Sequence, residues 1–153
     1  MNADARTAVV TDTTSYLPDE IVAEHGIERV SLYVILDGDQ RREGEISSGE
    51  YSDFYERIRR SSGGATTSQP SVGDFISVYE LLLAAGRDVV SVHISAGISG
   101  TCEAALQARE QLVADGKGGE RIHVRDSRSA CGGQGLVALA AARAAARGAS
   151  GEE

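Results

Sequence analysis

Apolar β-type runs alternate with helical patterns along most of this sequence, and that alternation restricts the fold more than any other feature. Strands are predicted where apolar and β-branched residues run together, at residues 7–12, 27–36, 88–95 and 122–126. Helices are predicted at residues 18–26, 48–60, 71–85 and 100–114, and in an alanine-rich segment that follows a turn at 127–135 and ends at Gly148. Such alternation is typical of an α/β fold with parallel-sheet β-α-β layers and helices on both faces.

Short signals mark where several elements begin and end. The capping-box pattern, in which a serine and an acid three residues later satisfy each other's amides, occurs at Ser47 with Glu50 and at Ser71 with Asp74. The Asp37-Gly38 pair predicts a turn. After that turn, residues 40–46 are predicted to return as a short edge strand.

Length and charge exclude several classes of protein. The 153 residues fit one ordinary domain. A net charge of −8, from 15 Lys and Arg against 23 Asp and Glu, argues against binding to nucleic acid or to anionic lipid head groups. No apolar run approaches the roughly 20 residues that cross a bilayer, and the first residues lack a signal-peptide core. We therefore predict a cytoplasmic protein with no transmembrane segment and no nucleic-acid partner.

The sequence offers no recognisable metal site. Cys102 and Cys131 have neither metal-ligand spacing nor a disulfide framework, so two reduced thiols are predicted. Asp12 and Asp126 end predicted strands, but nothing else supports them as a metal pair.

Four polar turns follow predicted strands or precede predicted helices. They are rich in hydroxyls and poor in Lys and Arg, and they comprise residues 12–15, 66–69, 95–101 and 126–129. In an open α/β sheet, ligands bind beyond the carboxyl ends of the strands. Hydroxyls and helix-start amides can together hold one carboxylate or phosphate. The alternative is that each Ser or Thr only caps a helix, and both interpretations remain open at this point.

Three other kinds of site receive little or no support from the order of the residues. A hydrolase or transferase using Ser99 or Cys102 has only the strand-turn-helix setting in its favour, since no histidine follows Ser99 with an acid between them. Residues 133–138 match a dinucleotide-binding pattern but lack its strand context, and no P-loop is present. His93 alternates with apolar residues on a predicted buried strand, which favours a packed core histidine.

Ordered motifs in this chain resemble those of the DegV family of bacterial fatty-acid-binding proteins. In sequence order they are Thr11-Asp12-Thr13-Thr14-Ser15-Tyr16-Leu17-Pro18, Thr66-Thr67-Ser68-Gln69-Pro70-Ser71, Ile94-Ser95-Ala96-Gly97-Ile98-Ser99-Gly100-Thr101, and Val124-Arg125-Asp126-Ser127 followed by Gly132-Gly133-Gln134-Gly135. The resemblance implies a carrier that binds one long-chain fatty acid and no other cofactor. It also implies a partner, a separate fatty acid kinase that makes an acyl phosphate, so the carrier itself has no catalytic residues.

By position in these motifs, the fatty-acid carboxylate is expected at Thr67, Ser68, Ser95 and Ala96. The family often has two consecutive serines in the third motif, and here the second is Ala96, so Ser95 or a backbone amide would have to substitute. The polar turns expected to support this site contribute Asp12, Thr14, Ser99, Gly100, Thr101 and Ser127. The fatty-acid tail would supply most of the affinity, at about 0.8 kcal/mol for each buried CH₂ group.

The resemblance also implies a chain about twice this long. Residues 1–153 would then form the N-terminal α/β lipid-binding domain, with the family's C-terminal domain absent. Ser150 followed by Glu152 and Glu153 resembles the opening of another helix. An apolar patch is expected where the second domain would pack. A truncated fragment with no binding activity is the remaining alternative.

Overall fold

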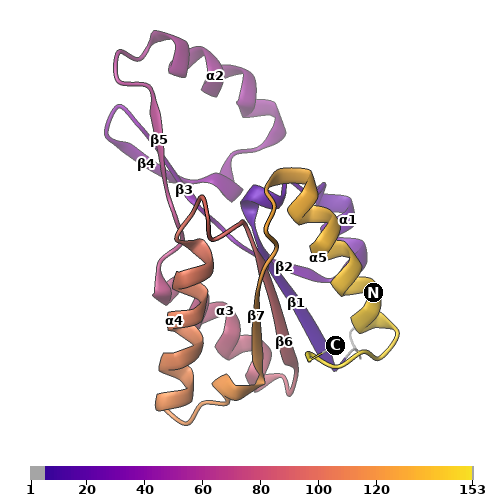
Figure 1. Cartoon of the computed structure of the whole chain (residues 1–153). Helices are drawn as coiled ribbons and strands as arrows, with labels where there is room; N and C mark the ends of the chain where they lie inside the picture. Colours follow the sequence, from indigo (N-terminus) through magenta and orange to yellow (C-terminus); the bar gives the residue numbers. More distant parts are fainter. Residues whose placement is uncertain (1–5, 153) are drawn as a thin grey trace.

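The computed structural model describes residues 6–152 and contains a parallel sheet with four strands (Figure 1). Its strands are β1 (Thr7–Asp12), β2 (Ile27–Val30), β6 (Asp88–His93) and β7 (Ile122–Asp126), in the order β2-β1-β6-β7. All neighbours run parallel, with Val9 opposite both Ile27 and Val90. The carboxyl ends of the central strands β1 and β6 therefore meet at one edge of the sheet.

Helices cover both faces of this sheet, which confirms the predicted α/β class. Successive residues of β1 point to opposite faces. Ala8 and Val10 join a core with α3 (Val72–Ala84) and α4 (Thr101–Ala114). Val9 joins a smaller core with α5 (Cys131–Ala146) and α1 (Asp19–His25).

The predicted strand at 27–36 is wrong as a single element, because the structure divides it between two sheets. β2 ends at Val30, and β3 (Tyr33–Leu36) belongs to a three-stranded antiparallel sheet. At the break, the Leu32 amide donates to Thr13 Oγ1 at 3.2 Å and the Leu32 carbonyl accepts from the Glu43 amide at 2.8 Å. β2 buries Ile27 and Val30 and β3 buries Val34 and Leu36, so buried apolar residues occur on both sides of the break.

The antiparallel sheet has the order β4-β3-β5, with β4 at Asp39–Arg42 and β5 at Ala65–Ser68. The Asp37-Gly38 turn joins β3 to β4 as predicted, with both residues at positive φ. The predicted edge strand at 40–46 is too long, since a 3-10 turn occupies Glu43–Glu45. Residues 66–69 were expected as a turn, but Thr66, Thr67 and Ser68 pair with β3. Their partner lies some thirty residues earlier, and the local sequence contains no signal for that pairing.

We call residues 33–68 the arm and the rest of the described chain the body. The arm includes helix α2 (Tyr51–Arg60), which lies at the top of Figure 1, away from the parallel sheet. Both capping boxes are confirmed, at Ser47 before α2 and at Ser71 before α3. No described residue of α2 is buried, whereas α3 buries Phe75, Tyr79, Leu82 and Leu83.

Helix α5 begins earlier than predicted, because residues 132–135 were assigned to the preceding turn. Three glycines there disfavour a helix by propensity. Tertiary packing requires them, however: a Cβ on Gly135 would lie 2.9 Å from the Ser15 carbonyl oxygen, and one on Gly133 would collide with Ser129 Oγ. Within residues 6–152, no helix is long and apolar enough to cross a membrane.

Candidate functional site

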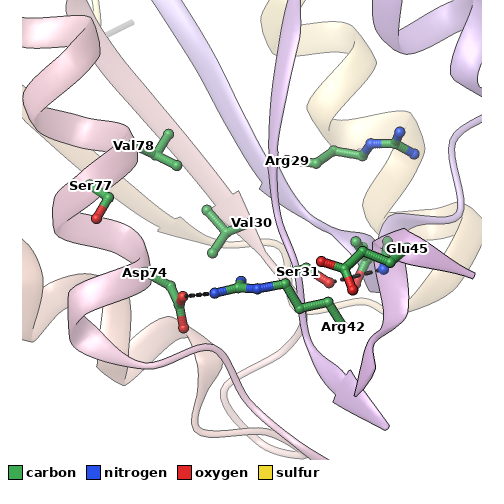
Figure 2. A pocket seen from close by; sticks show the side chains of 10 residues that line it. Arg29, Val30, Ser31, Arg42, Glu45, Asp74, Ser77 and Val78 are labelled. Carbon is green, nitrogen blue, oxygen red and sulfur yellow. Dashed lines mark hydrogen bonds and ion pairs between the residues drawn. The ribbon is translucent and has the colours of Figure 1, made fainter. Parts of the chain in front are cut away.

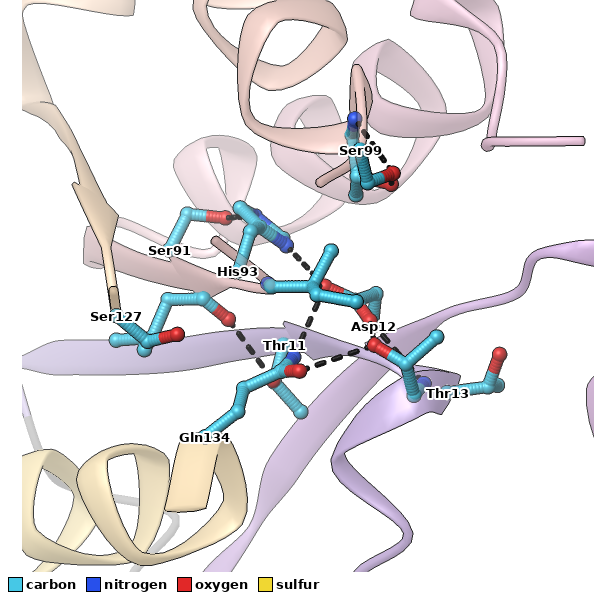
Figure 3. A network of polar contacts seen from close by, with 12 residues as sticks. Thr11, Asp12, Thr13, Ser91, His93, Ser99, Ser127 and Gln134 are labelled. Carbon is cyan, nitrogen blue, oxygen red and sulfur yellow. Dashed lines mark hydrogen bonds and ion pairs between the residues drawn. The ribbon is translucent and has the colours of Figure 1, made fainter. Parts of the chain in front are cut away.

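Asp12 and His93 are the last residues of the central strands β1 and β6, and their side chains meet at the carboxyl edge of the sheet (Figure 3). His93 Nδ1 lies 2.9 Å from Asp12 Oδ2. Both residues are completely buried. The prediction that His93 is a packed core histidine is confirmed, and its ring also makes an edge-on contact with Phe75, with 5.0 Å between centroids.

The Asp12 carboxylate is surrounded by donors from three segments. It accepts hydrogen bonds from the Thr14 amide at 3.1 Å, from the Ile94 amide at 3.2 Å and from Gln134 Nε2 at 3.0 Å, and a further short one from the Thr14 hydroxyl. Burial opposes ionisation, but the hydrogen bonds from His93, Thr14 and Gln134 outweigh it and lower the pKa of Asp12. Asp12 is therefore a buried, ionised carboxylate with its hydrogen-bonding capacity filled.

A second branch of this network runs from His93 into the core of the body. Ser91 Oγ lies 2.6 Å from His93 Nε2, and the Tyr79 hydroxyl donates to Ser91 Oγ at 2.7 Å. Ser91, His93 and Asp12 thus have the order of contacts found in a serine hydrolase. All three are fully buried, so no substrate can reach the serine.

The sequence analysis did not identify Gln134 as a member of the site. Its amide donates to both Thr11 Oγ1 (3.2 Å) and Asp12, and its carbonyl oxygen lies 2.9 Å from Thr14 Oγ1, whose proton is donated to Asp12. The available signal was a polar residue among glycines in the Gly132–Gly135 motif. That motif was interpreted as a turn, whereas the structure places Gln134 in the first turn of α5, facing the sheet edge.

Most hydroxyls of the β6–α4 and β7–α5 turns stabilise the turns themselves. Ser95 Oγ accepts from the Gly97 amide at 3.2 Å, which leaves its own proton available to a ligand. Ser99 Oγ lies 2.9 Å from Thr101 Oγ1 and accepts from the Thr101 amide at 3.3 Å. The Ser127 hydroxyl donates to the Ser129 carbonyl at 3.1 Å. The contacts of Ser99 and Ser127 close their own turns, and neither residue is a helix N-cap, since the N-caps of α4 and α5 are Gly100 and Ala130. Ala96 is exposed.

Thr67 and Ser68 lie on β5 of the arm, and both are exposed. One contact joins this strand to the β6–α4 turn of the body. The Gln69 side chain packs on Gly100 so closely that a Cβ there would lie 2.5 Å from Gln69 Oε1. The structure therefore brings the second and third motifs of the sequence together at Gln69 and Gly100.

Two cavities of similar volume lie in the described part of the chain. One of about 430 Å³ lies between α3 and the junction of β2 with the arm (Figure 2). Its charged lining is balanced, with Arg29 and Arg42 against Glu45 and Asp74, and Arg42 pairs with Asp74 at 2.7 Å. Neither this cavity nor the next is lined by Thr67, Ser68 or Ser95.

A second cavity of about 450 Å³ is an apolar groove between α5 and strands β6 and β7. Its lining is mainly valine and alanine, and Val137 on its rim is 42% exposed. The neighbouring Leu136 is 69% exposed. The expected apolar patch is therefore present on the body, and its cover by a second domain stays a prediction.

Nucleophilic catalysis at the β6–α4 turn receives no support from the geometry. Cys102 is buried, and burial together with Asp126 and Glu103 raises the pKa of its thiol, which favours the unreactive protonated form. The hydroxyl of Ser99 is engaged with Thr101 rather than with a base. Among residues 6–152 there is also no cluster of three or more potential metal ligands.

A parallel sheet covered by helices on both faces, with small polar turns at its carboxyl edge, defines an α/β protein, and comparisons identify its family. Residues 6–153 match the family model described as an uncharacterised protein of the DegV family, and the chain belongs to that family. A DegV domain-containing protein of Listeria monocytogenes is 42% identical over 139 residues, covering 90% of this chain and 47% of the relative. A DegV domain-containing 15.5 kDa protein of Staphylococcus aureus is 37% identical, covering 86% of this chain and 87% of the relative.

A solved structure extends the comparison to three dimensions. The DegV family protein of Thermus thermophilus, described as fatty acid binding, superposes with a TM-score of 0.83 at 34% identity. The match covers 95% of this chain and 49% of the Thermus chain. The present chain thus spans about half the length of the Listeria and Thermus relatives. It spans most of the short Staphylococcus relative.

Proposed function

We propose that this chain is a cytoplasmic lipid carrier that holds a long-chain fatty acid by its carboxylate and presents it to a fatty acid kinase. The observation that carries the proposal is the contact of Gln69 with Gly100, which brings the hydroxyls of β5 beside the β6–α4 turn in a DegV fold. Thr67 or Ser68 and Ser95 are the proposed carboxylate ligands.

The chemistry of these residues suits a single carboxylate. Hydrogen bonds to a charged acceptor are the strong ones, and hydroxyl donors provide them without a fixed counter-ion. The hydroxyl of Ser95 already has its turn-stabilising acceptor role filled by the Gly97 amide, and its proton remains for a ligand. Asp12 is a buried anion at the same edge of the sheet, and its charge would repel a ligand carboxylate. The ligand must therefore bind outside the Asp12 hydrogen-bond network, toward the exposed Ala96 and Thr67.

The role of carrier, rather than enzyme, follows from what the polar groups already do. Tyr79, Ser91, His93 and Asp12 are buried and bonded to one another. Cys102 is held in its protonated form. We propose that phosphoryl transfer to the bound carboxylate is performed by the separate kinase.

The test is fatty-acid binding by the purified chain, measured by lipid extraction with mass spectrometry and by titration with palmitate and oleate. Replacing both Thr67 and Ser95 by Ala is expected to weaken binding by a few kcal/mol, at roughly 1.5–3 kcal/mol for each hydrogen bond to a charged group. Thr66→Ala is the matched control, because Thr66 neighbours Thr67 on β5 and points to the opposite face.

Three outcomes contradict parts of the proposal. An unchanged affinity in the double variant places the carboxylate elsewhere. Equal losses in Thr66→Ala and Thr67→Ala remove the special role of Thr67. Absence of bound lipid and of binding to either fatty acid supports the alternative that the 153-residue chain has no binding activity alone.

A further inference from the structure

Three segments that are far apart in the sequence converge on one carboxylate at the sheet edge. Asp12 accepts from Thr14 in the β1–η1 turn, where η1 is the 3-10 turn Thr13–Ser15. It accepts from Ile94 at the start of the β6–α4 turn. It also accepts from Gln134 of α5, 122 residues away. The second of these segments continues directly into Ser95, a proposed carboxylate ligand.

The hydrogen-bond partners also assign the proton on His93. Tyr79 uses its hydroxyl proton on Ser91, so the single proton of Ser91 points to His93 Nε2. Nε2 is therefore an acceptor, and the ring proton lies on Nδ1, where it is donated to Asp12. A second ring proton would leave the Ser91 hydroxyl without an acceptor in a fully buried position.

Backbone hydrogen bonds to residues 127 and 129 hold the β6–α4 turn, which carries Ser95, on both sides of Ile94. The His93 carbonyl accepts from the Ser127 amide at 3.1 Å, and the Ser95 amide donates to the Ser129 carbonyl at 2.8 Å. Between them, the Ile94 amide is held by Asp12. The orientation of the β6–α4 turn thus depends on where the Asp12 carboxylate is held, and His93 Nδ1 is one of the groups that hold it.

We propose that Asp12 and His93 are positioning residues for the fatty-acid carboxylate site. The neutral His93 orients the Asp12 carboxylate, and Asp12 holds η1, the β6–α4 turn and the start of α5 in place relative to one another. This inference rests on the proposed function for its ligand. Neither residue is proposed as catalytic, because both are completely buried. Their role is to fix the direction in which Ser95 presents its hydroxyl.

Two substitutions at His93 separate positioning from simple stability. The amide nitrogen of Asn occupies nearly the place of Nδ1, so His93→Asn keeps a donor to Asp12 and loses the contact with Ser91. The amide of Gln reaches the place of Nε2, so His93→Gln keeps the contact with Ser91 and loses the donor to Asp12. Both variants lose one buried hydrogen bond and are expected to unfold at similarly reduced urea concentrations.

Palmitate affinity and backbone amide exchange are measured for the full chain and for both variants. His93→Gln is expected to weaken palmitate binding about tenfold and to speed amide exchange at residues 94–101. His93→Asn is expected to stay within about twofold of the wild type in affinity. Equal effects of both variants on affinity and exchange would overturn the proposal.

Two further variants, with smaller expected effects on stability, test the proposal if the His93 variants do not fold. Thr14→Val removes a donor to Asp12 on the β1 side of the network and conserves shape, and it is expected to speed exchange at Ile94 and Ser95. Tyr79→Phe removes a hydroxyl on the far side of Ser91 and should leave exchange there unchanged. The reverse pattern overturns the positioning role. If the wild type binds no fatty acid, the proposed function fails, and the exchange pattern still decides whether Asp12 holds the loops.

Discussion

The body and the arm of this molecule differ in how far their helices and strands are buried. The body buries a parallel sheet between helices, and even its polar residues at the sheet edge are buried and mutually bonded. In the arm, β5 is exposed along its whole length and no described residue of α2 is buried. The proposed ligand residues are divided between the two, with Ser95 on the body and Thr67 and Ser68 on the arm.

Several contacts hold the arm against the body, among them hydrogen bonds from the Tyr33 hydroxyl to Asp74 and from the Thr13 hydroxyl to Glu43. Arg42 of β4 pairs with Asp74 of α3, and its guanidinium also lies over the Tyr33 ring, 4.9 Å from the centroid. Gln69 packs on Gly100. The body half of the site, with Ser95, is therefore held by buried hydrogen bonds. The arm half, with Thr67 and Ser68, depends on a few contacts where the arm meets the body, which we call the seam.

The largest contrast is expected from matched phenylalanines. Phe75 of the body is fully buried, so Phe75→Ala should lower the free energy of unfolding by about 3–5 kcal/mol. Phe54 of α2 is only partly buried, so Phe54→Ala should cost less, about 1–2 kcal/mol, because the ring loses less buried apolar surface. Urea unfolding measures both. Equal losses would show that α2 belongs to the same cooperative core as α3.

The stabilisation that the seam contributes should depend on pH, because it includes the carboxylate of Asp74. Burial raises the pKa of this carboxyl, but hydrogen bonds from Ser71 and Arg42 outweigh that effect and lower the pKa to about 2 from an ordinary 3.8. Because the folded pKa is the lower one, the stabilisation is present above pH 3.8 and is lost as the pH falls through about 2.

Asp74→Asn should therefore lower the free energy of unfolding by about 2 kcal/mol at pH 7, and the difference from the wild type should shrink as the pH falls through about 2. Urea unfolding at a series of pH values measures this. Asp53→Asn, an exposed acid in the first turn of α2, is the control and should change little at any pH. A loss of the same size at both ends of the pH range would show that the charge of Asp74 is not what stabilises the seam.

The smallest effect is expected from the two capping boxes, which are the same motif in the two regions. Ser71→Ala should destabilise the whole chain by about 1 kcal/mol, because α3 is part of the core. Ser47→Ala should speed amide exchange in α2 without moving the global unfolding midpoint. A shift of the midpoint by Ser47→Ala would show that arm and body unfold as one unit.

Local patterns predicted much of the body. The strands at 7–12 and 122–126, both capping boxes and the buried position of His93 follow from periodicity and neighbouring residues, and the structure confirms them. The break at Ser31-Leu32 was not predictable in this way. An apolar run reports burial, and burial continues across the change from one sheet to the other.

The candidate site was only partly predictable for the same reason. The hydroxyl-rich motifs drew attention to Asp12, Thr14 and Ser95, which lie in or beside the network at the sheet edge. Gln134 and Ser91 were missed because a polar residue in a helix or strand carries no local sign of its distant partner.

By itself, the sequence determined the alternation of strands and helices, the caps that begin α2 and α3, and the supply of neutral donors in the turns. These depend on residues within a few positions of one another, where backbone propensity and capping act. Only the tertiary structure decided that β5 pairs with β3, that glycines at 133 and 135 admit close packing, and that Asp12 receives a donor from Gln134. Those outcomes depend on which surfaces meet after the chain has folded, and contacts across more than a hundred residues are set by packing rather than by local pattern.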